Sequence, residues 1–297
     1  MDALDLVLRA GVVLFMVGSL GGVGLGLAPR DALAPLMHGR FVALTLVGCW
    51  LVCPAVAYLL LLVVPLERPY AAGLLLVALS PCAPFAPAMV QVARGNAAYV
   101  AAFLILSAAT TVVFMPVAIP LLISGLAVDA MAIARPLLIF VLLPLALGMT
   151  INAASGRAAK RIQVPVALIT NVLGVLVLVL IGVRHGGAVI DAVGSLAIAA
   201  QVLFIGAVTI TAYQLGAGLI PEQRSVLTLG VCTRNLGAAL APLATVDSDP
   251  RAMVMIAIAA PVTIVLSAGA ARWLARRSRP AAQPSTAPAS MLGSGRR

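Results

Sequence analysis

The chain has 297 residues, of which 63% are hydrophobic and only 9% charged, whereas soluble domains usually carry about 25% charged residues. Together with a mean hydropathy of +1.15, this composition excludes a soluble enzyme domain, a disordered protein and a disulfide-rich secreted fold. It indicates a polytopic helical membrane protein. The net charge of +10 does not indicate nucleic-acid binding, because the basic residues lie between apolar runs and not on one face. All cysteines fall inside apolar stretches and are expected to be buried thiols: Cys49, Cys53, Cys82 and Cys232.

Nine apolar stretches approach the length of roughly 20 residues that crosses a bilayer. In chain order they are 10–27, 41–62, 70–92, 97–123, 136–154, 164–183, 194–219, 225–245 and 252–271. The short connections between them predict one transmembrane transporter domain, residues 1–275. The Pro/Ala/Ser-rich sequence 276–297 cannot build a core and is expected to be a disordered cytoplasmic tail.

The distribution of basic residues predicts an external N-terminus and a cytoplasmic C-terminus in the plasma membrane, since positive charge collects on the cytoplasmic side. With nine spans, the inner side then holds Arg30, Arg40, Arg94, Arg157, Lys160, Arg161, Arg224, Arg272, Arg276, Arg277, Arg279, Arg296 and Arg297. The outer side holds Arg9, Arg68, Arg135, Arg184 and Arg251.

Two of the stretches, the third and the eighth, are not ordinary helices. The third contains Pro81, Pro84 and Pro87, which remove amide donors and clash with preceding carbonyl groups. The eighth places Arg234, with glycines, threonines and an asparagine around it, in the middle of an apolar run. The alternative for each is a kinked helix with polar contacts. Because both breaks occur, in spans that cross in opposite directions, we expect an all-α membrane protein of nine transmembrane helices. Its inverted repeats would have two discontinuous helices that cross at the midplane.

The residues at these breaks resemble the bile acid:sodium symporter family. The similar segments are 79–82 through 93–96 in the first break, Gly24-Leu25 before Pro29 and Asp31, Pro54-Ala55, and Asn235 followed by Gly237. The resemblance covers about residues 7–275. It implies inverted five-helix repeats with substrate and sodium bound where the broken helices cross, and nine helices match the variant that lacks the first helix.

Most side chains that the resemblance implies as sodium ligands are replaced in this chain. The family's serine and asparagine of the first break correspond to Ala86 and Pro87, and its polar residues elsewhere correspond to Val100, Leu104, Cys49, Gly230 and Arg234. No Asp or Glu lies inside a predicted span, although a hard cation prefers oxygen ligands. A guanidinium about 6 Å away would cost a sodium ion about 2.8 kcal/mol at an effective dielectric of 20. Sodium is therefore disfavoured, and no other cofactor or metal is expected.

Arg234 is the most informative single residue. A charge at mid-membrane costs about 2.5–3.5 kcal/mol and usually faces a polar cavity. It predicts a fixed positive charge that binds a small carboxylate or sulfonate, assisted by the positive ends of the two half-helices. The alternative is a structural arginine that hydrogen-bonds carbonyl groups freed by the first break. The predicted substrate-binding residues are Ser80, Pro81, Cys82, Ala86, Pro87, Thr233, Arg234 and Asn235.

Polar and small residues elsewhere in the spans are expected to serve packing. Gly18, Gly22 and Gly26 recur every four residues on one helix face, which favours close approach of a neighbouring helix. Asn171 and similar polar residues of other spans could line a path, but contacts between helices are their commoner use.

These features predict a secondary transporter that moves a small organic anion by alternating access, with the anion and the lipid bilayer as expected partners and no nucleic acid. Two alternatives remain: a sodium-coupled symporter of an organic anion, and an arsenite or metalloid efflux permease in which Cys82 and Cys232 act as soft ligands. An enzyme is not expected, because no intramembrane His, Asp or Glu is present and no P-loop occurs. Substrate identity, direction of transport and oligomeric state stay open.

Overall fold

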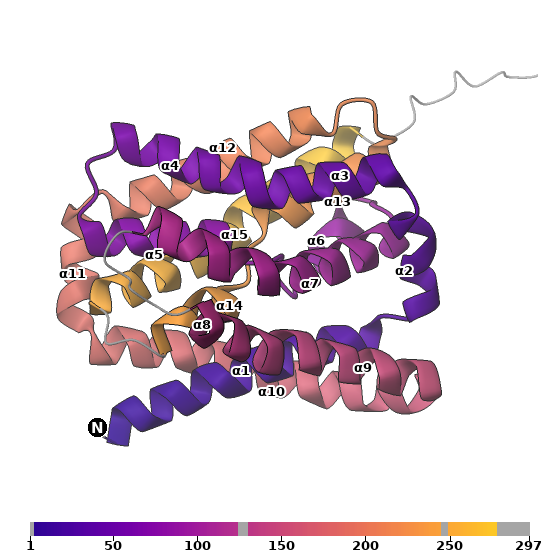
Figure 1. Cartoon of the computed structure of the whole chain (residues 1–297), viewed down its shortest axis with the longest axis horizontal. Coiled ribbons are helices and arrows are strands. Elements are labelled where there is room, and N and C mark those ends of the chain that lie inside the picture. The colour runs from indigo at the N-terminus through magenta and orange to yellow at the C-terminus, as the bar shows by residue number, and fades with distance from the viewer. Residues whose placement is uncertain (1–2, 124–129, 245–248, 278–297) are drawn as a thin grey trace, which may run out of the picture.

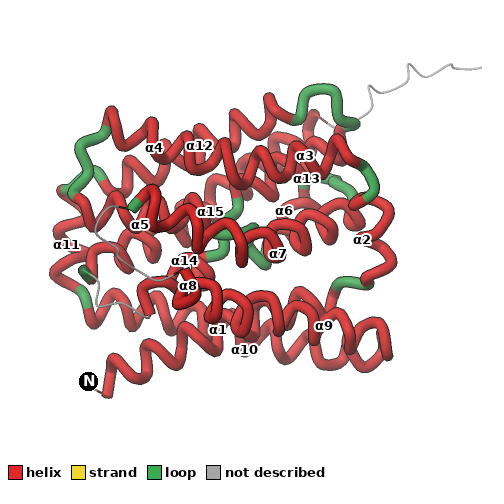
Figure 2. Tube along the Cα trace, in the orientation of Figure 1, coloured by secondary structure: helices red, strands yellow, loops and turns green. Residues whose placement is uncertain are grey.

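The computed structural model describes residues 3–123, 130–244 and 249–277, and within these ranges every regular element is a helix (Figure 2). The elements of the first half are α1 (Ala3–Gly26), α2 (Pro29–Leu36), α3 (Gly39–Val47), η1 (Gly48–Val52), α4 (Cys53–Val63), α5 (Arg68–Leu79), α6 (Ala86–Val92) and α7 (Ala97–Leu122). The second half contains α8 (Ala130–Leu137), η2 (Leu138–Leu142), α9 (Leu143–Ala154), α10 (Gly156–Arg184), α11 (Gly186–Gly194), α12 (Ala197–Leu215), α13 (Pro221–Cys232), α14 (Leu236–Leu240), η3 (Pro242–Ala244) and α15 (Pro250–Arg277).

Seven continuous helical segments in the described ranges are long and apolar enough to cross a membrane. They are Leu6–Gly26, Gly39–Val63, Ala97–Leu122, Ala130–Ala154, Gly156–Arg184, Ala197–Leu215 and Pro250–Arg277, and they coincide with seven of the nine predicted stretches. The other two predicted stretches, 70–92 and 225–245, are each divided into two short helices, α5 with α6 and α13 with α14. An all-helical membrane fold is therefore confirmed, while nine crossings and inverted repeats remain predictions.

Helices α1, α8, α10 and α15 each extend six or more residues beyond the predicted spans, and in α10 and α15 the added residues are polar and were left out of an apolar stretch. Helix α10 already begins at Gly156, where the hydroxyl of Ser155 caps it by accepting a hydrogen bond from the amide of Ala158 at 3.3 Å. Such a cap satisfies an amide that has no partner within the helix. Helix α15 continues through Arg276 and Arg277, and the rest of the predicted tail, 278–297, lies outside the described residues.

The helices divide into two groups, which Figure 1 shows one above the other. Helices α1, α9 and α10 pack on one another along their length, and we call them the panel. The second group, which we call the body, contains α3, α4, α5, α7, α12, α13 and α15. Within it α5 packs on α7 and α15, and α13 packs on α7, α12 and α15. The N-terminus lies at the left of Figure 1 and the yellow end of α15 at the right, so the described chain starts and ends on opposite sides of the bundle.

The panel is held together by a close crossing of α1 and α9. A Cβ atom added at Gly148 would lie 2.4 Å from the carbonyl oxygen of Gly21 and 2.7 Å from the amide nitrogen of Leu25. At Gly24 a Cβ would lie 2.3 Å from the carbonyl oxygen of Leu145. These neighbours are backbone atoms that cannot move aside, so only glycine lets the two helices approach this far.

Replacing Gly148 by alanine is therefore expected to destabilise the protein, because the added methyl group forces α1 and α9 apart. Overpacking of this kind costs about 1–3 kcal/mol. The matched control is Gly182→Ala on α10, where an added Cβ meets nothing within 4 Å. Thermal denaturation of the detergent-purified variants should give a lower midpoint for Gly148→Ala alone. Equal midpoints for the two variants would show that α1 and α9 do not approach closely enough for the added methyl group to clash.

Candidate functional site

The first break separates α5 from α6 at the three prolines. The amide and the hydroxyl of Ser80 both donate to the carbonyl of Val77, at 3.2 and 2.8 Å, and Ser80 is then extended with ψ of 155°. A residue that precedes proline is pushed out of the helical region by the proline ring, and Pro81 follows here. The chain resumes as a helix only at Ala86, so Pro81 to Phe85 form a non-helical segment within the protein.

The second break separates α13 from α14 at Thr233, Arg234 and Asn235. Thr233 leaves the helix with ψ of 123°, while its hydroxyl still donates to the carbonyl of Leu229 at 2.8 Å. The side chain of Asn235 caps α14, because its Oδ1 accepts a hydrogen bond from the amide of Ala238 at 3.2 Å. Asparagine is among the best residues for this position.

The two non-helical segments contact each other as a short antiparallel bridge between Cys82 and Arg234. The amide of Ala83 donates to the carbonyl of Thr233 at 3.1 Å, and the amide of Asn235 donates to the carbonyl of Pro81 at 2.8 Å. Irregular backbone inside a membrane is stable only where its polar groups find partners in protein or water. Here each broken helix supplies partners for the other, and we call this junction the crossing.

Arg234 is buried at the crossing, with 1% of its surface exposed. Its Nη1 donates to the carbonyl oxygen of Ser80 at 2.8 Å, and its Nη2 contacts the thiol of Cys53, which follows the π-helical turn η1. Throughout the part of the chain that the structure describes, no carboxylate pairs with this guanidinium. Within the described ranges, the positive charge at the crossing is therefore uncompensated.

Two hydrogen-bond donors at the crossing have no acceptor among the described residues. They are Nε of Arg234 and Nδ2 of Asn235, and each side chain is only 1% exposed. A buried donor without an acceptor costs about 1–3 kcal/mol, so such groups mark a place where water or a ligand completes the hydrogen bonding. Because both groups are N–H donors, they would bind an acceptor atom of a ligand and would not bind a cation.

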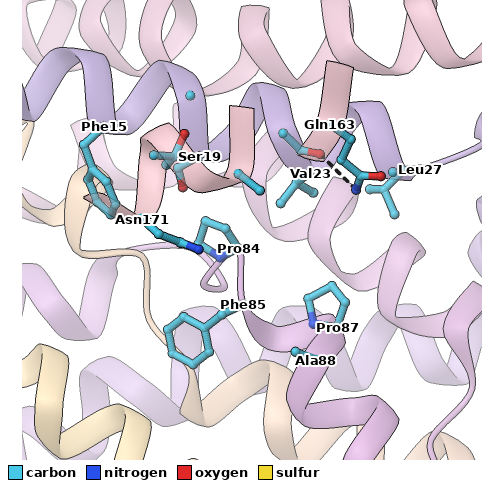
Figure 3. Close-up of a pocket in the computed structure, with 15 residues that line it drawn as sticks. Phe15, Ser19, Val23, Leu27, Pro84, Phe85, Pro87, Ala88, Gln163 and Asn171 are labelled. Carbon is cyan, nitrogen blue, oxygen red and sulfur yellow. Dashed lines mark hydrogen bonds between the residues drawn. The ribbon is translucent and has the colours of Figure 1, made fainter. Parts of the chain in front are cut away.

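A cavity of about 410 Å³ lies next to the crossing, between the panel and the start of α6 (Figure 3). One wall continues directly from the crossing and consists of Pro84, Phe85, Pro87 and Ala88. The opposite wall comes from α1 and α10 and contains the polar side chains of Ser19, Gln163, Thr170 and Asn171 beside Phe15, Val23 and Leu27. The Oγ atom of Ser19 has no hydrogen-bond partner among the described residues. The lining is thus mostly apolar with a few polar groups, as is usual for small-molecule sites.

The structure brings the predicted site residues together but gives them different positions. Ser80, Pro81, Cys82, Thr233, Arg234 and Asn235 form the crossing, and Ala86 is fully buried beside it. Only Pro87 of the predicted set lines the cavity. The guanidinium of Arg234 contacts a carbonyl freed by the first break, which is the structural role considered as the alternative for this residue.

Residues of α1 and α10 complete the cavity, although sequence reasoning favoured packing for the glycines of α1 and named Asn171 only as a residue that could line a path. The glycine repeat was the available signal: Gly18, Gly22 and Gly26 line the cavity. A Cβ at Gly18 or Gly26 would lie within 2.4 Å of the side chains of Thr170 and Gln163 respectively. The repeat therefore does admit a neighbouring helix, as expected, and it also leaves room for a cavity.

In the described part of the chain, no three His, Cys, Asp or Glu side chains are grouped so that they could hold a metal ion. The thiol of Cys82 lies 3.5 Å from the hydroxyl of Thr233, and the thiol of Cys232 donates to the carbonyl of Leu229. Each thiol thus has its own partner.

Two broken helices that meet inside a bundle of membrane-length helices are the arrangement used by secondary transporters. A family model described as the sodium bile acid symporter family matches residues 12–213, and the chain belongs to this family. The protein is accordingly an integral membrane protein of the bile acid symporter type. No curated protein matches the chain.

Proposed function

We propose that the protein is a secondary transporter of a small organic anion, which it binds in the cavity between the panel and the crossing. The observation that carries this proposal is the buried charge of Arg234, which no carboxylate of the described residues compensates. The hydrogen-bond donors of Arg234 and Asn235 that have no acceptor among the described residues also favour an anionic ligand. Arg234 does not line the cavity, so its charge acts on a bound anion through space in this conformation.

The size of that attraction is sufficient to select an anion. For a separation of about 6–10 Å between the guanidinium and a bound anion, two opposite unit charges attract by about 1.7–2.8 kcal/mol at an effective dielectric of 20, which corresponds to about 15- to 100-fold in affinity. The polar groups of Ser19, Gln163 and Asn171 on the opposite wall would orient the carboxylate or sulfonate. The apolar part of the substrate would contact Phe15 and Phe85.

Alternating access would come from movement of the panel against the body. The cavity lies on the seam between the two groups, since α1 and α10 form one wall and the first break forms the other. Phe15 of α1 also lies close to α14, because a Cβ at Gly237 would be 3.4 Å from its ring. A shift of the panel would therefore change both the cavity and its contacts with the crossing. In this proposal the N-terminus is external, the C-terminus is cytoplasmic and the membrane is the plasma membrane.

Transport is expected to proceed without sodium, because the guanidinium of Arg234 already supplies a cation at the crossing. Its Nη1 donates a hydrogen bond to the carbonyl oxygen of Ser80. A carbonyl oxygen is the type of ligand that a monovalent cation would need. The positions that the resemblance implies for sodium ligands hold buried apolar side chains at Val100 and Leu104, and Gly230 packs against the ring of Phe103.

This proposal is tested with purified protein in proteoliposomes and a set of radiolabelled monocarboxylates and sulfonates. We expect saturable uptake of at least one anion, at the same initial rate when potassium or choline replaces sodium. Empty liposomes and liposomes with heat-denatured protein serve as controls. A rate that rises steeply with sodium concentration would overturn the sodium-independent mechanism. Uptake of cations or neutral solutes in place of anions would overturn the function.

A further inference from the structure

A second cavity of about 410 Å³ lies at the other side of the body, where α12 ends, α13 begins and α15 ends. Its walls include Tyr213, Pro221, Arg224, Ser225 and Arg277. None of these residues contributes to the crossing or to the cavity of Figure 3, so the proposed transport function does not account for them.

The two arginines are held on aromatic rings. The guanidinium carbon of Arg224 lies 3.5 Å above the ring centre of Tyr213, and its Nε donates to the carbonyl oxygen of the same residue at 2.8 Å. The guanidinium of Arg277 lies 4.4 Å from the ring of Trp273, and its Nη1 donates to the hydroxyl of Tyr213 at 3.3 Å. Stacking fixes the planes of both groups and leaves further N–H donors for a ligand.

Neither arginine has an acidic partner within the ranges that the structure describes. Ser225 adds a donor without an acceptor: it is 1% exposed, it lines this cavity, and its Oγ atom has no hydrogen-bond partner among the described residues. Two positive charges and a free hydroxyl around one cavity match the oxygens of a phosphate group, which arginine binds through paired hydrogen bonds.

The position of the cavity favours a phosphate that belongs to a lipid. Two membrane-length helices, α12 and α15, end beside it, and Tyr213 and Trp273 pack edge to face at this level with ring centres 4.8 Å apart. Tyrosine, tryptophan and arginine at span ends are typical of the membrane interface. Ile210, one helical turn before Tyr213, is 61% exposed, so an acyl chain could extend along α12 from the cavity.

We propose that this cavity binds the phosphate of an anionic glycerophospholipid. Arg224 and Arg277 contact the phosphate oxygens, Ser225 donates a third hydrogen bond, and Trp273 packs beside the glycerol region. Basic pockets between transmembrane helices recognise anionic head groups in this way. The bound lipid would tie the end of α15 to α12 and α13, and it would leave the transport cavity unchanged.

The test uses delipidated protein in detergent and follows thermal denaturation during titration with phosphatidylglycerol, phosphatidylcholine or inorganic phosphate. We expect a saturable rise in the midpoint with phosphatidylglycerol only, since a ligand that binds the folded state stabilises it. The variant Arg224→Gln/Arg277→Gln should raise the half-saturating concentration about 10- to 100-fold, which is about 1.4–2.7 kcal/mol, because it removes hydrogen bonds between charged groups. The matched control is Arg276→Gln, which removes an exposed arginine on the same turn of α15 that does not line the cavity.

Four results would overturn the proposal. Equal stabilisation by phosphatidylcholine would show that the head-group charge is not recognised, and equal stabilisation by inorganic phosphate would assign the cavity to a soluble ligand. An equal loss in Arg276→Gln would indicate diffuse surface charge instead of a site. If the double variant does not fold, Arg277→Gln alone is compared with Arg276→Gln, since both side chains are exposed. An unchanged affinity in Arg277→Gln then rejects the site. None of these readouts depends on transport.

Discussion

Substitution of Arg234 by glutamine is expected to raise the KM for anion uptake about 15- to 100-fold in proteoliposomes, by removal of the electrostatic attraction estimated above. Glutamine is uncharged but long enough to donate to the carbonyl of Ser80, which Arg234 contacts at 2.8 Å. This choice limits the damage to the crossing, because a buried carbonyl without a donor would itself cost about 1–3 kcal/mol.

Two further variants separate charge from structure in this experiment. Arg234→Lys keeps the charge but loses the planar donor geometry, so it should retain more anion affinity than the glutamine variant. Arg161→Gln removes the same charge from an exposed position on α10 and should leave KM unchanged. If Arg234→Gln transports with the wild-type KM, the guanidinium has a structural role only, and the anion is recognised by other groups.

The second large effect is expected from Ala88→Trp. Ala88 is exposed into the cavity of Figure 3 from the start of α6, so an indole at this position would occupy the space proposed for the substrate. We expect uptake to fall roughly tenfold or more with an unchanged denaturation midpoint, since the added ring fills space that is already open. The measurement is the initial rate of uptake per reconstituted protein.

Ala153→Trp is the matched control, because Ala153 is an exposed alanine on α9 that does not line the cavity. It should transport at the wild-type rate. If Ala88→Trp transports as fast as Ala153→Trp, the substrate does not pass through this cavity, and the binding site would have to lie elsewhere on the seam between panel and body.

The two breaks could be predicted because their causes are local. Three prolines at three-residue spacing forbid a continuous helix whatever surrounds them, and the structure duly ends α5 at Leu79 and resumes at Ala86. The polar residues around Arg234 do not break a helix by steric clash, but burying them within an uninterrupted apolar helix would cost too much free energy. The same reasoning could not give the ends of α10 and α15, which polar residues extend beyond the apolar stretch.

The partners of the site residues could not be predicted, since they depend on tertiary contacts. The pairing of Arg234 with Cys53 joins residues far apart in the chain, and no pattern in either segment indicates it. The wall that α1 and α10 supply to the cavity was missed for the same reason. The repeat of Gly18, Gly22 and Gly26 indicates a helix face that another element approaches, but it does not say whether a side chain or a substrate fills the space.

The central claim is that an anion binds between the panel and the crossing, and anomalous scattering tests it most directly. Crystals of the protein soaked with an iodinated carboxylate, such as iodobenzoate, would locate the iodine atom independently of any transport assay. We predict an anomalous peak in the cavity bounded by Pro84, Phe85 and Ala88 on one side and by Ser19 and Asn171 on the other, and a clearly weaker peak in crystals of Arg234→Gln soaked at the same concentration. A peak only in the cavity of Arg224 and Arg277, or a peak of equal height in the Arg234→Gln variant, would contradict the claim.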